Sequence, residues 1–101
     1  MSGTAPGPYY LDPDLFRLAL GAALRERREE LSLSQTALAE RVKVNQTRIW
    51  EWETGYHVIR LDRLLVLCEA LATSVAAVMT RAETATRDAM RQQADARRKG
   101  A

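Results

Sequence analysis

The chain has 101 residues, of which 47% are hydrophobic, a length that allows one domain of roughly 60 to 80 ordered residues and excludes two. The formal net charge is only +2, although the sequence pI is about 9.0. Charge therefore permits nucleic-acid binding without requiring it.

Residues 1–11 read as a flexible N-terminal arm, because glycines and prolines recur there among small polar residues. Asp12 then supplies a helix cap and Pro13 a first helical residue. We predict a helix over residues 13–31, and its apolar residues fall on one stripe: Phe16, Leu20, Ala23, Leu24 and Leu31. The opposite face is a dense run of Arg and Glu, typical of a solvated surface.

Residues 35–55 read as two short helices joined by a tight turn. Ser34 caps the first helix, which opens at Gln35, and Asn45 caps the second, which spans residues 46–54 and stops at Gly55. Ala39 provides a small side chain over which the two helices can approach closely. The pattern predicts a helix-turn-helix.

The second of these helices divides into two faces on a helical wheel. Ile49 and Trp52 point inward, and the other face carries Gln46, Thr47, Trp50, Glu51 and Thr54. Short polar side chains that donate and accept, with no lysine among them, suit the reading of base edges in a major groove.

Two further helices follow the loop at residues 56–60. The fourth is predicted from six apolar residues that we expect in the core: Leu61, Leu64, Leu65, Cys68, Leu71 and Ala72. Ser74 caps the last helix. A stripe of mostly small residues on one side of this helix continues beyond residue 80, where we expect the compact domain to end: Met79, Ala82, Thr86, Ala89, Gln93 and Ala96. This helix could reach about residue 98. The fold class is therefore all-α with five helices, the last one extended.

Several short motifs lie at characteristic distances from one another between residues 20 and 79: Leu20-Gly21, Leu33-Ser34-Gln35, Leu38-Ala39, Ile49, Trp52-Glu53, Gly55 and Leu64-Leu65. With this combination the sequence resembles the phage repressor and Cro family of helix-turn-helix regulators, also called the xenobiotic-response-element type. The resemblance implies a compact repressor-like DNA-binding domain, which we place at residues 12–80, followed by a C-terminal helical extension or tail at residues 81–101. One departure is Lys43, which stands at a turn position usually held by Gly.

The resemblance and the helical wheel together assign the site residues. Bases would be read by Gln46, Thr47, Trp50 and Glu51. Phosphates would be held by Gln35, Lys43, Arg48, Arg60 and Arg63. In similar proteins an Arg at position 28 pairs with the Glu that follows the Trp, here Glu53, and this ion pair would be structural.

The function predicted from these features is sequence-specific binding of double-stranded DNA by a transcriptional regulator, a repressor in the first instance, acting as a homodimer. The stripe beyond residue 80 is the expected contact with the second subunit, and a frayed, solvated tail is the alternative. A competing interpretation is a repressor-like protein-interaction module, such as an antitoxin or an accessory regulator, in which Trp50 anchors a protein partner and the C-terminal helix binds a second protein.

Other classes of function lack their sequence signals. There is no Gly-rich phosphate loop, no cluster at metal-ligand spacing and no nucleophile beside a base, so we expect neither catalysis, nor a metal, nor a cofactor. A single cysteine, Cys68, excludes an intrachain disulfide. No segment reaches the roughly 20 apolar residues of a membrane span, and no leader pattern opens the chain, so we expect a cytoplasmic protein.

Overall fold

The computed structural model describes residues 6–100, and this range holds five helices and no strand. They are α1 (Pro13–Glu30), α2 (Gln35–Val42), α3 (Gln46–Glu53), α4 (Leu61–Ala70) and α5 (Val75–Gly100). The predicted all-α fold is confirmed, and the helix ends differ little: α1 ends at residue 30 rather than 31, α3 at 53 rather than 54, and α5 at 100 rather than 98. Residues 1–5 of the predicted arm lie outside the described range, as does residue 101.

Four of the five helices begin at a side chain that caps them. Each capping oxygen accepts a backbone N–H of the following turn at 2.9 to 3.0 Å, and the caps are Asp12, Ser34, Asn45 and Ser74. Such caps stabilise a helix by about 1 kcal/mol each. They fix the helix starts that the sequence predicts.

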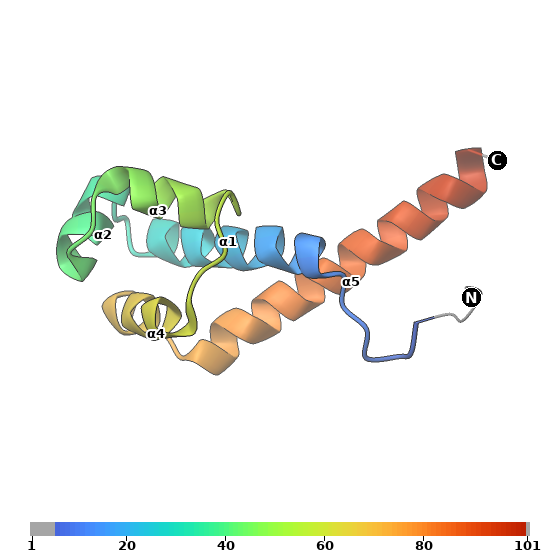
Figure 1. Cartoon of the computed structure of the whole chain (residues 1–101), viewed down its shortest axis with the longest axis horizontal. Coiled ribbons are helices and arrows are strands. Elements are labelled where there is room, and N and C mark those ends of the chain that lie inside the picture. Colours follow the sequence, from blue (N-terminus) through green and yellow to red (C-terminus); the bar gives the residue numbers. More distant parts are fainter. Residues whose placement is uncertain (1–5, 101) are drawn as a thin grey trace.

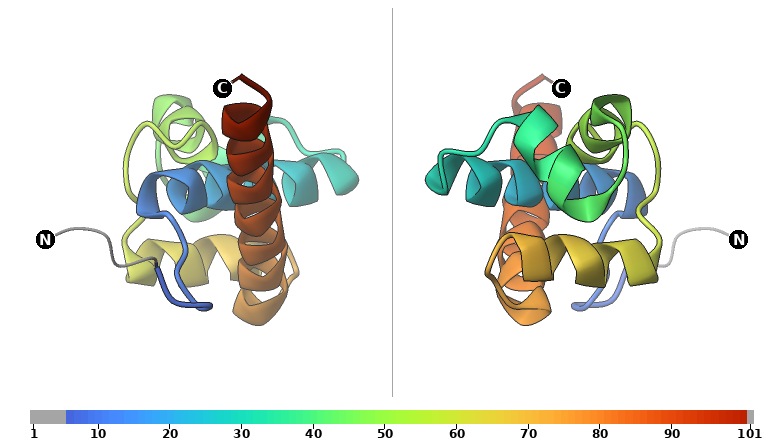
Figure 2. Two further views of the ribbon diagram at one scale, coloured as in Figure 1. Left: turned by 90° about the vertical axis from the view of Figure 1, so that its right-hand side faces the viewer. Right: turned by 90° about the vertical axis from the view of Figure 1, so that its left-hand side faces the viewer.

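The long helix α1 forms the centre of the fold. It contacts α3 on one side and α5 on another, while α2 contacts α3 and α4. Figures 1 and 2 show α2 and α3 together at one end of the molecule, with α4 beside them and α5 crossing α1. The buried apolar core between the helices consists of Ala23, Leu24, Leu38, Ala39, Val42, Ile49, Trp52, Leu64, Leu67, Cys68, Leu71 and Val78.

Helix α4 buries a narrower face than the sequence predicts. Leu61 and Leu65 are 68% and 52% exposed, and Ala72 is also exposed, so the expectation that these three residues lie in the core was wrong. The reason is that α4 packs mainly on α2 and α5, which leaves the side of the helix with Leu61 and Leu65 uncovered. Cys68 is buried as predicted, and burial raises the pKa of its thiol.

Helix α5 has a packed half and an exposed half. Ala82 and Thr86 are fully buried, and Arg81 bridges to α1 through Glu26 at 3.5 Å and Glu30 at 3.2 Å. Every residue from 91 to 100 is exposed, and Figure 1 shows this end projecting away from α2 and α3. The helix therefore passes residue 80 without a break.

Across residues 6–100 no single helix is both long and apolar enough to cross a membrane. Only α4 and α5 taken together pass on length and composition, and they are bent by 108° relative to each other.

Candidate functional site

Helix α3 presents one buried and one exposed face. Ile49 and Trp52 are 1% and 5% exposed and hold the helix in the core. Gln46, Thr47 and Trp50 are exposed on the outside. The side chain of the remaining predicted base reader, Glu51, is only 18% exposed, so it lies at the edge of this outer face.

A buried ion pair fixes α3 against α1. Arg28 donates from Nε to Glu53 Oε2 at 2.6 Å and from Nη2 to Glu53 Oε1 at 2.9 Å, and its Nη1 donates to the Leu33 carbonyl at 2.7 Å. The two side chains are 8% and 3% exposed. The hydrogen bonds to Glu53 raise the pKa of Arg28. This bidentate geometry sets both the distance and the rotation of α3 relative to α1.

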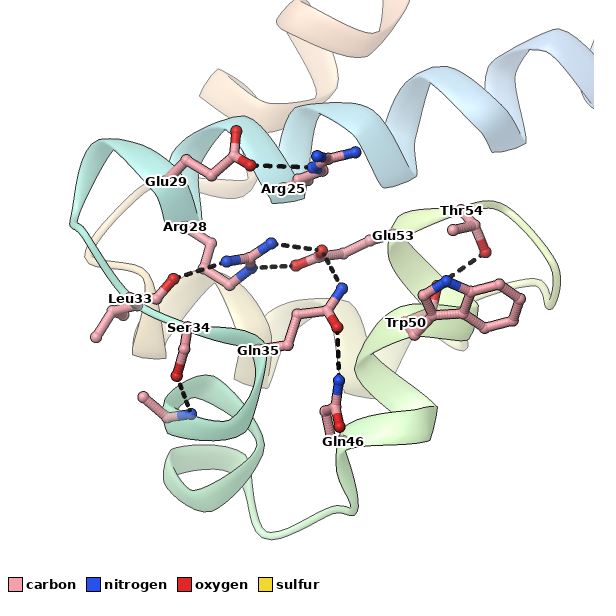
Figure 3. A network of polar contacts seen from close by, with 11 residues as sticks. Arg25, Arg28, Glu29, Leu33, Ser34, Gln35, Gln46, Trp50, Glu53 and Thr54 are labelled. Carbon is pink, nitrogen blue, oxygen red and sulfur yellow. Dashed lines mark hydrogen bonds and ion pairs between the residues drawn. The ribbon is translucent and has the colours of Figure 1, made fainter.

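Two glutamines extend this ion pair to the exposed face of α3 (Figure 3). Gln35 donates from Nε2 to Glu53 Oε1 at 3.0 Å, and Gln46 donates from Nε2 to Gln35 Oε1 at 2.9 Å. Glu53 thereby orients the amide of Gln35, and Gln35 orients the amide of Gln46. Gln46 keeps its carbonyl oxygen and its second N–H available to a ligand.

The backbones of α1 and α3 lie unusually close together at Gly21. A Cβ at this position would lie 2.4 Å from the Trp52 carbonyl oxygen and 2.6 Å from that of Glu53. Any side chain here would push α3 outward. Gly21 therefore allows the short separation across which Arg28 reaches Glu53.

The turn between α2 and α3 contains a lysine in a left-handed conformation. Lys43 has φ 59° and ψ 46°, and its N–H donates to the Ala39 carbonyl at the end of α2. The turn thus keeps the geometry that glycine adopts without strain, although its residue is lysine. Its side chain is exposed beside the start of α3.

The C-terminal end of α3 is closed by a left-handed glycine. Gly55 has φ 74°, its N–H donates to the Trp52 carbonyl at 3.3 Å, and the N–H of Tyr56 donates back to the Glu51 carbonyl at 2.9 Å. This pair of bonds is the Schellman arrangement. It turns the chain back so that the ring of Tyr56 lies 5.8 Å from the ring of Trp50 between centroids.

An open groove of about 920 Å³ separates the start of α3 from the start of α4. Its lining includes three of the predicted phosphate contacts: Arg48, Arg60 and Arg63. Arg60 is paired with Asp62 at 3.2 Å and lowers the pKa of that carboxyl group, and Arg48 lies 3.7 Å from Glu51. Arg63 forms no ion pair with any residue in the range 6–100.

Sequence reasoning missed three contacts that position these elements. Arg27 donates to the carbonyls of Leu71 at 2.9 Å and Ala72 at 3.0 Å, and so ties α1 to the end of α4. Arg17 donates to the Gly55 carbonyl, and Tyr56 packs on Trp50. Arg27 lies in a charged run that is typical of a solvated face, Arg17 stands alone between apolar residues, and no local pattern connects residues 44 apart in sequence.

Comparison with known proteins identifies the family. The model of the helix-turn-helix domain family matches residues 19–80. No curated protein matches the chain significantly. Similar solved structures include the following three. Two are crystal structures of the clp gene regulator ClgR from Corynebacterium glutamicum, both 34% identical to this chain, with TM-scores of 0.68 and 0.77.

The first ClgR match covers 82% of this chain and 99% of that chain, and the second covers 81% and 87%. The third structure is the restriction-modification controller protein C.AhdI from Aeromonas hydrophila, at 28% identity and a TM-score of 0.60, covering 66% of this chain and 98% of that one. These matches confirm the resemblance drawn from the sequence. The chain belongs to the helix-turn-helix domain family and is a DNA-binding transcriptional regulator of the Cro-like, xenobiotic-response-element type.

Proposed function

We propose that the exposed face of α3 enters the major groove of double-stranded DNA and reads a specific sequence, and that the chain acts as a repressor. The observation that carries this proposal is the orientation of Gln46. Its amide is held by Gln35 with one acceptor and one donor free. Adenine presents the complementary pair, N6–H and N7, on its major-groove edge.

The other three base readers lie around Gln46 with different chemistry. Thr47 offers a hydroxyl, and Trp50 offers an apolar ring. Glu51 can accept from a cytosine amine, and its charge is offset by Arg48, 3.7 Å away. This compensation reduces the repulsion between the carboxylate and the DNA backbone.

Phosphate binding is assigned to residues on both sides of α3. Lys43 and Gln35 flank its N-terminal end, and Arg48, Arg60 and Arg63 line the groove between α3 and α4. The starts of both helices also direct free backbone amides toward this region, where the helix dipole favours an anion. Of the arginines, Arg63 has the fewest competing contacts, so we expect its contribution to be the largest.

The experiment is a selection from a random duplex library, followed by affinity measurements between 50 and 200 mM salt. Arg63→Ala should weaken binding to all sequences alike and reduce the salt slope by about one unit. Arg25→Ala is the matched control, because it removes the same charge from the exposed surface of α1, outside the groove between α3 and α4. Equal effects of the two variants would contradict the assigned phosphate site.

We also propose that the protein binds a two-fold symmetric site as a homodimer, with half-sites about one helical turn apart. The exposed half of α5 supports this, because α1 already covers the first part of the predicted stripe and leaves residues 91–100 for a partner. Light scattering on the full chain should give a dimer mass, and a chain ending at Met90 should give a monomer. A monomer mass for the full chain at tens of micromolar would contradict the proposal.

The competing proposal is a protein-interaction module, favoured by the 46% exposure of Trp50. Salt separates the two functions, because DNA binding weakens steeply with salt whereas a contact anchored by Trp changes little. If no duplex is selected from the library, the DNA proposal fails and the protein-interaction proposal takes its place.

A further inference from the structure

Two aromatic rings stand together at the far end of the α3 face. Trp50 and Tyr56 are 46% and 65% exposed, and their ring centroids lie 5.8 Å apart at an interplanar angle of 44°. Neither ring contributes to the buried core. Figure 3 shows the Trp50 ring lying over the α3 ribbon below Thr54. An exposed pair of aromatic rings on the face that carries Gln46 indicates a binding contact.

The chemistry of the indole limits what that ligand can be. Indole has a single N–H donor and no acceptor, so it cannot form the bidentate hydrogen bonds that distinguish one base from another. What it offers is a broad apolar surface. The C5-methyl group of thymine is the one apolar group that an ordinary base pair presents in the major groove.

The position of Trp50 fits a second base contact beside that of Gln46. The two residues are four apart on one helix, so they are separated by about 6 Å along the axis at 1.5 Å per residue. Successive base pairs are spaced by about 3.4 Å. A base touched by Trp50 would therefore lie about two base pairs from the one read by Gln46.

Tyr56 holds the tryptophan ring in place. The left-handed Gly55 directs the chain back, and the two backbone hydrogen bonds at the end of α3 set Tyr56 beside Trp50. The tyrosine ring in turn packs against His57, with centroids 4.8 Å apart. An exposed side chain restrained in this way loses less conformational entropy when it binds.

We infer that Trp50 recognises the C5-methyl group of a thymine about two base pairs from the adenine read by Gln46, and that Tyr56 is a positioning residue for Trp50. This inference rests on the proposed DNA-binding function. It assigns to the loop after α3 a role in specificity that the motif itself does not contain.

The test replaces thymine by deoxyuridine, which removes only the methyl group. A duplex is first selected from an unmethylated random library, in which thymine is the only source of a C5-methyl group. Each thymine of the selected site is then replaced singly. We expect one position near the adenine to lose affinity by about threefold to fivefold, the effect of one methyl group taken out of apolar contact.

Three variants identify the residues responsible. Trp50→Ala should bind the thymine and deoxyuridine duplexes equally. Tyr56→Ala should reduce the preference for thymine, and Tyr56→Phe should retain it, since the ring rather than the hydroxyl contacts Trp50. Gln46→Ala is the control, because it should weaken binding but leave the thymine preference intact.

The outcomes separate this inference from the proposed function. If the protein binds its selected duplex and every deoxyuridine duplex equally well, the methyl contact is overturned while DNA binding stands. If Trp50→Ala leaves the affinity for the selected duplex unchanged, Trp50 does not contact the base and the inference is overturned as well. If no duplex is selected, the inference falls together with the function on which it rests.

Discussion

The two faces of α3 differ in how completely their polar groups are satisfied. On the inner face Arg28 and Glu53 are buried and hydrogen-bonded to each other, and no buried side-chain polar atom in residues 6–100 lacks a partner. On the outer face Gln46 keeps free donor and acceptor groups, and Trp50 is exposed to solvent. The inner face therefore contributes to folding, and the outer face is left to bind a ligand.

This difference means that stability and recognition should respond to different substitutions. Gln35 contacts both systems, because its amide donates to Glu53 and accepts from Gln46. Substitution of Arg28 or Glu53 should change the free energy of unfolding. Substitution of Gln46 or Trp50 should change DNA affinity alone.

The largest effect is expected for the buried ion pair. Arg28→Ala or Glu53→Ala alone should destabilise the fold by about 3 to 5 kcal/mol, because each leaves a buried charge without its partner. A double-mutant cycle measured by urea unfolding gives the coupling energy. The exposed pair Arg25 and Glu29 on the same helix is the control, and it should couple by only about 0.2 to 1 kcal/mol. A coupling energy for the buried pair no larger than this would refute the structural role.

The next effect concerns the close approach of α1 and α3. Gly21→Ala should cost about 3 kcal/mol, because its methyl group would overlap the carbonyl oxygens of Trp52 and Glu53. Gly100→Ala is the matched control, since a Cβ there meets nothing within 4 Å. Thermal melts of the two variants should differ clearly. Similar melting temperatures would mean that the two helices are not held at this distance.

Replacement of Gln46 should separate recognition from stability. Gln46→Ala should weaken binding to the preferred site by about 1 to 3 kcal/mol and relax the preference at one base pair. Its unfolding free energy should stay within about 0.5 kcal/mol of the wild-type value, as is usual for a surface substitution. Binding titrations on preferred and scrambled duplexes measure the first effect. Equal weakening on both duplexes would argue against a base-reading role.

The smallest effect is expected at the turn between α2 and α3. Lys43→Gly should be neutral or stabilise the fold by up to about 1 kcal/mol, because the backbone there is already left-handed. If the lysine also contacts phosphate, the salt dependence of DNA binding should become shallower. Melting curves and salt titrations check the two parts. Destabilisation with an unchanged salt slope would contradict both.

Local signals in the sequence predicted much of the fold. The four caps and Gly55 act within a few residues, so the starts of α1, α2, α3 and α5 and the end of α3 could be predicted from residues 12, 34, 45, 74 and 55. The left-handed conformations of Ser32 and Ala72 were not predicted, because neither residue type favours that conformation. Which side of α4 is covered could not be predicted either, since Leu61 and Leu65 fit the helical period as well as Leu64 does.

The candidate site likewise has features that the sequence predicted and features that it did not. Periodicity placed Gln46 and Trp50 on one face of α3, and resemblance to a known family suggested that Arg28 faces Glu53. The contacts of Arg27 with the end of α4 depend on how distant segments pack, whereas the contact of Tyr56 with Trp50 follows from the local turn at Gly55. Such contacts leave no periodic trace in the sequence. They became visible only in three dimensions.

Contact between the outer face of α3 and DNA is tested most directly by chemical-shift mapping. The selected duplex is titrated into isotope-labelled full-length protein, and backbone and side-chain amide shifts are followed by nuclear magnetic resonance. We predict the largest shifts at Gln46, Thr47 and the Trp50 indole, with little change over residues 91–100. Shifts concentrated at the end of α5, with none at Gln46 or Trp50, would contradict the account.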